Sequence, residues 1–267
     1  MSESAPYVIR GGVAGRERLK VLARVMHAGT SSLLDQLGDL TGMRCLDAGC
    51  GGGDVTRELA RRVGPSGRVL GVDFDETKIA LAQDEAKVHG VTNVEFRCAR
   101  IGGDDIEGAF DFVYSRFLLT HLTDPRAAMA QFHRLLRAGG LVALEDIDFS
   151  GYFVYPESDA HRRYVDLYCG AVRHNGGDPD IGKKLPLLVR QHRFADIVVS
   201  VSQPMGLDGD VKLITPMTME NIAEAVVGAG LASREEVASL AQALYAHAAD
   251  AETIAGMPRV VQVWGRA

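Results

Sequence analysis

The chain has 267 residues and a formal net charge of −6, with 46% hydrophobic and 24% charged residues. This length is enough for one α/β core with embellishments, and the negative charge argues against broad contact with a nucleic-acid backbone. The apolar runs are shorter than the roughly 18 residues that a membrane span requires, so we expect neither a nucleic-acid partner nor a membrane span.

The N-terminal part predicts a helical cover over the core. Residues 1–6 lack the basic start, apolar stretch and cleavage site of a secretory signal, which predicts a cytoplasmic protein. An interrupted apolar stripe then predicts a helix over residues 16–38.

Residues 44–147 alternate between strand and helix patterns. The predicted strands cover residues 44–47, 68–73, 94–98, 110–115 and 141–147. The predicted helices cover residues 54–63, 76–89 and 125–138, and Asp75 and Asp124 are suited to cap the last two. Strands separated by helices imply right-handed crossovers and a parallel sheet that is covered on both faces. Ligands of such a sheet bind at the carboxyl ends of its strands, where we expect Asp47, Asp73, Ser115 and Asp146.

The remaining sequence shows no repeat, low-complexity stretch or interdomain linker. Its patterns predict helices over residues 156–171, 181–192, 218–227 and 234–249. They predict strands over residues 197–202 and 259–264.

A glycine turn follows the first predicted strand. Residues 46–53 read Leu-Asp-Ala-Gly-Cys-Gly-Gly-Gly, and the next strand ends in Asp73. Glycines let the backbone approach a ligand, and a carboxylate at the second strand end can accept both hydroxyls of a ribose. A dinucleotide fingerprint needs a third glycine where Asp54 stands, and an acid there would face the phosphates. The spacing therefore argues against a dinucleotide.

These motifs, from about residue 42 to residue 147, resemble those of the class I S-adenosylmethionine-dependent methyltransferases that act on small molecules. The resemblance implies an α/β fold with a doubly wound, mostly parallel seven-stranded sheet whose last strand is antiparallel. It also implies S-adenosylmethionine as the cofactor, with S-adenosylhomocysteine as its product. From the sequence patterns we expect in addition an N-terminal helical cover and a lid inserted after the fifth strand. We expect one domain, 1–267, with the cover at 1–41, the cofactor-binding core at 42–150, the lid at 151–195 and C-terminal sheet and helices at 196–267.

The resemblance also implies which residues bind the cofactor. Gly49, Cys50 and Gly51 would run along its ribose and methionine portion. Asp73 would hold the ribose hydroxyls, and Asp47 at the end of the first strand joins this group.

Later strand ends add further expected contacts. Phe74 would pack on the adenine, unless it belongs to the ordinary strand-end core. Ser115 and Arg116 would lie by the methionine end, where the guanidinium either pairs with the cofactor carboxylate or is a solvated helix-start group.

The adenine end departs from the family pattern at one position. Arg100 stands where many relatives carry an acid that contacts the adenine amino group. Asp104, Asp105 or the backbone of Ile101 would then supply that contact.

Three residues are candidates for catalysis at the methyl acceptor. Glu145 and Asp146 end the fifth strand on opposite sides, so at most one faces the reaction centre, and a hydrated strand end is the alternative. Either carboxylate would orient or deprotonate the acceptor. His121 lies near the fourth strand end and is a candidate base. We rank it below the carboxylates because a histidine in an apolar segment is more often packed.

Aromatic and basic residues characterise the acceptor side. Six aromatic residues between positions 149 and 168 predict a pocket for a partly aromatic or apolar acceptor, although packing of a lid helix explains some of them. Residues 7–24 carry five basic residues against one acid: Arg10, Arg16, Arg18, Lys20 and Arg24 against Glu17. This segment either closes over the methionine carboxylate or an acidic acceptor, or forms a solvated helix face.

We therefore predict an enzyme that transfers a methyl group to a small organic acceptor, and leave a homodimer and a role in secondary metabolism open. The alternatives are a non-methylating cofactor-binding or cyclase-like protein on the same scaffold and, less favoured by the glycine spacing, an NAD-dependent dehydrogenase. The four cysteines form no Cys-x-x-Cys pair, so neither a disulfide nor a metal site is indicated.

Overall fold

The computed structural model describes residues 12–267, with side chains from Gly15 onward. Arg10 and the expectations for residues 1–11 lie outside the described residues. Among residues 12–267, no helix combines the length and the apolar character needed to cross a membrane.

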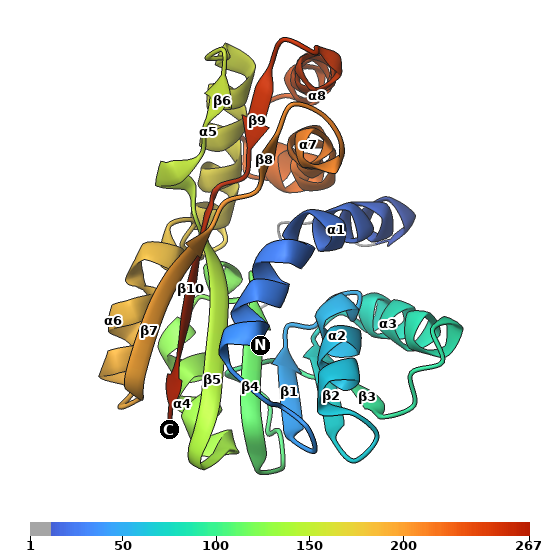
Figure 1. The fold of residues 1–267 in the computed structure, drawn as a ribbon. Helices are drawn as coiled ribbons and strands as arrows, with labels where there is room; N and C mark the ends of the chain where they lie inside the picture. Colours follow the sequence, from blue (N-terminus) through green and yellow to red (C-terminus); the bar gives the residue numbers. More distant parts are fainter. Residues whose placement is uncertain (1–11) are drawn as a thin grey trace.

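The centre of the molecule is a seven-stranded sheet with strand order β3-β2-β1-β4-β5-β10-β7 (Figure 1). Its strands are β1 (Arg44–Ala48), β2 (Arg68–Asp73), β3 (Val94–Cys98), β4 (Phe110–Arg116), β5 (Leu136–Asp148), β7 (Ala195–Ser202) and β10 (Arg259–Arg266). The first five strands pair in parallel, and β10 is antiparallel to both of its neighbours. The predicted doubly wound, mostly parallel sheet with an antiparallel last strand is confirmed.

Helices cover both faces of this sheet because successive strand residues point to opposite sides. One face packs against α4 (Pro125–Leu135) and α6 (Leu185–Gln191), and Leu46 of β1 belongs to this core. The other face packs against α1 (Gly12–Gln36) and α2 (Asp54–Val63), and the adjacent Cys45 belongs to that core. The helix α3 (Glu76–Val88) lies beside β3 and β2.

The helix starts follow the predicted capping. Asp75 accepts hydrogen bonds from the N–H groups of Thr77 and Lys78 at the start of α3. Asp124 accepts the N–H groups at the start of α4, where Pro125 occupies the first turn. These caps fix the chain at the points where it leaves the strand ends.

A third hydrophobic cluster lies over the carboxyl ends of the parallel strands. It joins α1 to α5 (Asp159–His174), α7 (Asp210–Gly228) and α8 (Arg234–Ala249). Figure 1 shows α1 between this upper layer and the helices α2 and α3. The N-terminal cover and the lid after the fifth strand are thus both present, and they enclose the edge of the sheet where ligands are expected.

Two parts of this upper layer differ from the sequence prediction. A small sheet with order β6-β9-β8 joins β6 (Val154–Tyr155), β9 (Ile254–Gly256) and β8 (Met205–Gly206), and strands this short give no periodic pattern. The helix α7 begins at Asp210 instead of residue 218, and it contains Pro216. Proline usually ends a helix, which explains the late predicted start.

Candidate functional site

The glycine turn at the end of β1 needs its glycines for conformational reasons. Gly49 has φ 77° and Gly51 has φ 52°, a region that side chains other than glycine rarely adopt. A Cβ atom at Gly49 would lie 3.1 Å from Leu118. The N–H groups of Gly49 and Cys50 both donate to the carbonyl of Val72, at 2.8 and 2.9 Å, so the turn is bound to β2.

Asp73 at the end of β2 holds the same turn from its other side. Its Oδ2 accepts the N–H of Gly51 at 3.0 Å, and its Oδ1 accepts the N–H of Asp75 at 3.0 Å. The Lys78 ammonium lies 4.0 Å from Oδ1. Asp73 is only 7% exposed, yet it lines both cavities described below. Each carboxylate oxygen keeps one acceptor position for a ligand.

The first cavity has a volume of about 390 Å³ and lies over Gly49 and Asp73. Phe74, Arg100 and Ile101 also line it, so the structure brings the residues expected at the adenine end into one place. Phe74 is 41% exposed, which is unusual for a large apolar side chain, and the Lys78 ammonium lies 5.6 Å from the centre of its ring. A cavity of this size is in the range that binds nucleoside-sized ligands.

The turn after β3 determines which groups reach this cavity. Asp104 accepts the backbone N–H of Arg100 at 2.7 Å, and Asp105 lies 3.8 Å from Arg134. Neither aspartate lines the cavity. Gln131 of α4 accepts the N–H of Gly102 at 2.6 Å and so fixes the turn, a role that the sequence did not reveal.

A second cavity of about 110 Å³ adjoins the first. Both cavities are lined by Gly49, Asp73, Lys78, Phe117 and His121. The far wall of the second cavity comes from α1, α5, α7 and the segment after β5: Arg18, Leu19, Leu22, Phe149, Tyr164, Tyr168, Ile214 and Thr218. The two cavities together offer room for a nucleoside and for a smaller molecule beside it.

Half of the predicted aromatic run forms this wall. Phe149 stacks on Tyr168 with ring centroids 4.5 Å apart, and Tyr164 packs next to both. The Tyr152 hydroxyl forms a hydrogen bond of 3.0 Å with the Thr215 hydroxyl and does not line the cavity. Phe153 and Tyr155 are exposed outside it.

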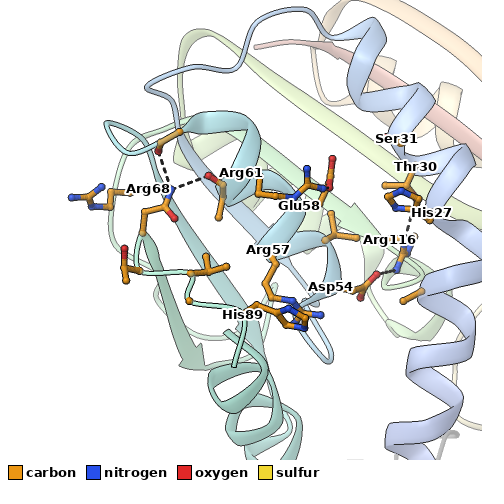
Figure 2. Close-up of a pocket in the computed structure, with 18 of the residues that line it drawn as sticks. His27, Thr30, Ser31, Asp54, Arg57, Glu58, Arg61, Arg68, His89 and Arg116 are labelled. Atoms are coloured by element: carbon orange, nitrogen blue, oxygen red, sulfur yellow. Dashed lines mark hydrogen bonds and ion pairs between the residues drawn. The ribbon is translucent and has the colours of Figure 1, made fainter. Parts of the chain in front are cut away.

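Arg116 at the end of β4 is buried in an ion pair. Its Nη2 donates to Asp54 Oδ2 at 2.7 Å and its Nη1 donates to Thr30 Oγ1 at 3.1 Å, as Figure 2 shows. The side chain is 9% exposed, so it is not a solvated helix-start group. Arg116 and Asp54 line both the second cavity and a basic cleft of about 800 Å³ between α1 and α2.

Asp47 and Ser115 lie beneath the glycine turn. Asp47 lines the second cavity and accepts the hydroxyl of Thr56 at 2.5 Å. Burial raises the pKa of Asp47 to about 7, although the bond from Thr56 acts in the opposite direction. Ser115 donates to the carbonyl of Ala48 at 2.9 Å and does not line either cavity.

Glu145 and Asp146 point to opposite sides of β5, and neither lines either cavity. Glu145 accepts hydrogen bonds from Thr30 Oγ1 at 2.8 Å, Gln262 Nε2 at 2.8 Å and the Tyr114 hydroxyl. These partners enclose the carboxylate between β5, β10 and α1. The geometry therefore does not favour Glu145 as a group that meets the acceptor.

Asp146 holds a turn. Its carboxylate accepts the N–H groups of Thr120 at 3.1 Å and Ile147 at 2.9 Å, and burial raises its pKa to about 7. Thr120 lies in the 3-10 helix η1 (Leu119–His121). Asp146 therefore positions the turn that carries His121.

His121 lines both cavities at the point where they meet. Burial, together with the positive charges of Lys78 and Arg18, lowers its pKa to about 3. The imidazole is therefore neutral near pH 7. Of the three predicted catalytic residues, the structure brings His121 closest to the cavities, which reverses the order that the sequence suggested.

Among the side chains from Gly15 onward, no three His, Cys, Asp or Glu residues lie close enough together to hold a metal ion.

Arg18, Lys78 and Thr218 line the second cavity, and the sequence did not single out Lys78 or Thr218. Only tertiary structure brings these residues, from α1, α3 and α7, to the strand ends.

Comparison with known proteins adds independent information. A family model described as a methyltransferase domain matches residues 39–177, more than half of the chain. The chain is 36% identical over 162 residues to the demethylmenaquinone methyltransferase of Lactococcus lactis, with 60% of each chain covered. It is 33% identical over 117 residues to a ubiquinone biosynthesis O-methyltransferase of Pseudomonas aeruginosa, with 43% of this chain and 49% of that protein covered. The matches thus span about half to three fifths of the length of these relatives.

The fold is similar to that of phosphoethanolamine N-methyltransferase 2 from Haemonchus contortus, solved with phosphomonomethylethanolamine and S-adenosylhomocysteine. The TM-score is 0.57 at 17% identity, with 94% of this chain and 57% of that chain covered. At this identity the similarity concerns the fold alone. Since the family model matches residues 39–177, the chain belongs to the class I S-adenosylmethionine-dependent methyltransferase family.

Proposed function

We propose that the protein transfers a methyl group from S-adenosylmethionine to a small organic acceptor. The observation that carries this proposal is the pair of adjoining cavities that share Gly49, Asp73 and His121. The larger cavity suits the nucleoside part of a cofactor. Cys50 and Gly51 line the smaller one, which suits the methionine end of the cofactor and an acceptor held next to it.

The residues around the larger cavity fit S-adenosylmethionine. The Asp73 carboxylate has acceptor capacity for the ribose hydroxyls, and Gly49 places no Cβ atom in the cavity. Phe74 and Ile101 provide apolar surface for the adenine. When bound there, S-adenosylmethionine supplies an electrophilic methyl group on a positively charged sulfur.

The protein contributes mainly orientation and exclusion of water. The aromatic wall of Phe149, Tyr164 and Tyr168 covers the second cavity and holds the acceptor at the strand ends. An imidazole with a pKa of about 3 is a weak general base at neutral pH, so we assign His121 to positioning the acceptor. A proton released by the acceptor would then pass to solvent.

The second cavity supports a small, partly aromatic or apolar acceptor. Its wall combines aromatic rings with the aliphatic side chains of Leu19, Leu22 and Ile214. Two relatives are named demethylmenaquinone methyltransferase and ubiquinone biosynthesis O-methyltransferase, which supports an organic ring system as the acceptor type. A homodimer and a cytoplasmic location stay predictions.

Calorimetry with S-adenosylmethionine, S-adenosylhomocysteine and NAD tests the proposal. We expect both sulfur compounds to bind and NAD to bind weakly or not at all. Tight NAD binding without a response to S-adenosylmethionine would favour the dehydrogenase instead. Binding of the cofactor with no release of S-adenosylhomocysteine across a library of acceptors would favour the non-methylating alternative.

A further inference from the structure

Arg18 is a buried cation in the wall of the second cavity. It is 7% exposed, and its Nε donates to Thr218 Oγ1 at 2.9 Å. Among the side chains that the structure describes, no carboxylate forms an ion pair with it. The neutral hydroxyl of Thr218 satisfies one N–H group and leaves the positive charge without a counterion.

The other two cations around this cavity each face a carboxylate. Arg116 pairs with Asp54 at 2.7 Å, and Lys78 lies 4.0 Å from Asp73. Asp47 is the remaining acid, and it is bound to Thr56. A buried charge that lacks a partner is costly, so such a group at a cavity wall indicates an anionic ligand.

Arg18 belongs to the wall of the second cavity that α1, α5 and α7 form. Thr218 belongs to α7. Tyr164 of α5 also lies close to Arg18: burial raises the pKa of Tyr164, and the positive charge of Arg18 acts in the opposite direction. The glycine turn and Arg116 belong to the strand ends. Arg18 and His121 both line the second cavity, and the charge of Arg18 contributes to the lowered pKa of His121.

We propose that Arg18 binds a carboxylate of the methyl acceptor, so that the substrate is a small organic acid. This rests on the proposed function of the site. The guanidinium of Arg18 keeps two nitrogens for a planar, bidentate partner, and a carboxylate matches them in geometry and charge. An acid group bound at Arg18 leaves the opposite end of the acceptor toward Gly49 and His121. The same chemistry exists in the cofactor's methionine carboxylate, and the experiment separates the two sources.

The test uses the full chain saturated with S-adenosylhomocysteine and a panel of small phenolic and aliphatic carboxylic acids, each with its primary amide. Calorimetry measures the affinity for both members of each pair. For at least one pair we expect the parent protein to bind the acid roughly 10-fold or more tightly than the amide. Arg18→Gln should lose this preference, and Arg18→Lys should retain part of it.

Arg24→Gln is the matched control, because Arg24 lies on the same helix but pairs with Asp210 outside the second cavity. It should keep the preference for the acid, and all variants should bind S-adenosylhomocysteine within about 3-fold of the parent. The proposal is overturned if no acid binds the parent better than its amide. It is also overturned if Arg18→Gln loses affinity for S-adenosylhomocysteine but keeps the preference for acids, since Arg18 would then serve the cofactor. Failure of the parent to bind S-adenosylhomocysteine would instead refute the proposed function.

Discussion

Replacement of Asp73 by alanine should weaken cofactor binding by at least about 100-fold. In our proposal the carboxylate accepts two ribose hydroxyls, and each hydrogen bond to a charged acceptor contributes roughly 1.5–3 kcal/mol. Two such bonds correspond to a factor of 100 or more in the dissociation constant. Because Asp73 also accepts the N–H groups of Gly51 and Asp75 at 3.0 Å, the variant should lose about 1–3 kcal/mol of stability as well.

Calorimetry with S-adenosylhomocysteine and a thermal unfolding curve measure the two effects separately. Asp73→Asn keeps one oxygen acceptor without the charge, so its affinity should fall between those of the parent and the alanine variant. Asp105→Ala is the control, because that side chain is 87% exposed and does not line either cavity. Parental affinity in a folded Asp73→Ala protein would refute the assignment of the ribose site.

Three further outcomes follow from the geometry of the site. Gly49→Ala places a Cβ atom 3.1 Å from Leu118 at φ 77° and should weaken S-adenosylhomocysteine binding. Gly90→Ala, with φ 65° and no atom within 4 Å of the new Cβ, should lower stability alone, and calorimetry and thermal unfolding compare the two variants. His121→Gln should lower turnover by less than about 100-fold without changing the pH profile near neutrality, and a larger loss with a shifted profile would identify it as a base. Burial raises the pKa of Asp47 from 3.8 to about 7, so its stabilising contribution is complete below about pH 4 and is lost as the pH rises to about 7. In urea unfolding, the stability of Asp47→Asn should therefore depend less on pH over that range than the stability of the parent does. An equal dependence of stability on pH in both proteins would contradict the raised pKa.

The sequence predicted the cofactor half of the fold because its signals are local. A glycine turn after β1, an acid ending β2 and capping residues such as Asp124 each determine the structure within a few residues. The order of strands and helices then confines the topology to a parallel, doubly wound sheet. The boundaries of α2 and β2 agree with the prediction residue by residue.

The acceptor half depends on contacts between distant segments, which local patterns do not contain. Glu145 looked like a strand-tip acid open to a ligand, but Thr30 and Gln262 come from α1 and β10 and enclose it. Arg18 looked like one member of a basic helix face, and only its packing against Thr218 identifies it as a buried cation. The first two turns of α7 were likewise not predicted, because proline usually ends a helix and Pro216 lies within this one.

Transfer of an isotopically labelled methyl group tests the central claim most directly. The full chain is incubated with S-adenosylmethionine that carries carbon-13 in its methyl group, together with pools of small organic acceptors, and the products are followed by mass spectrometry. We expect the label to appear in an acceptor in an amount equal to the S-adenosylhomocysteine formed, and to be lost in Asp73→Ala. A protein that binds the cofactor yet transfers no label to any acceptor would contradict the account.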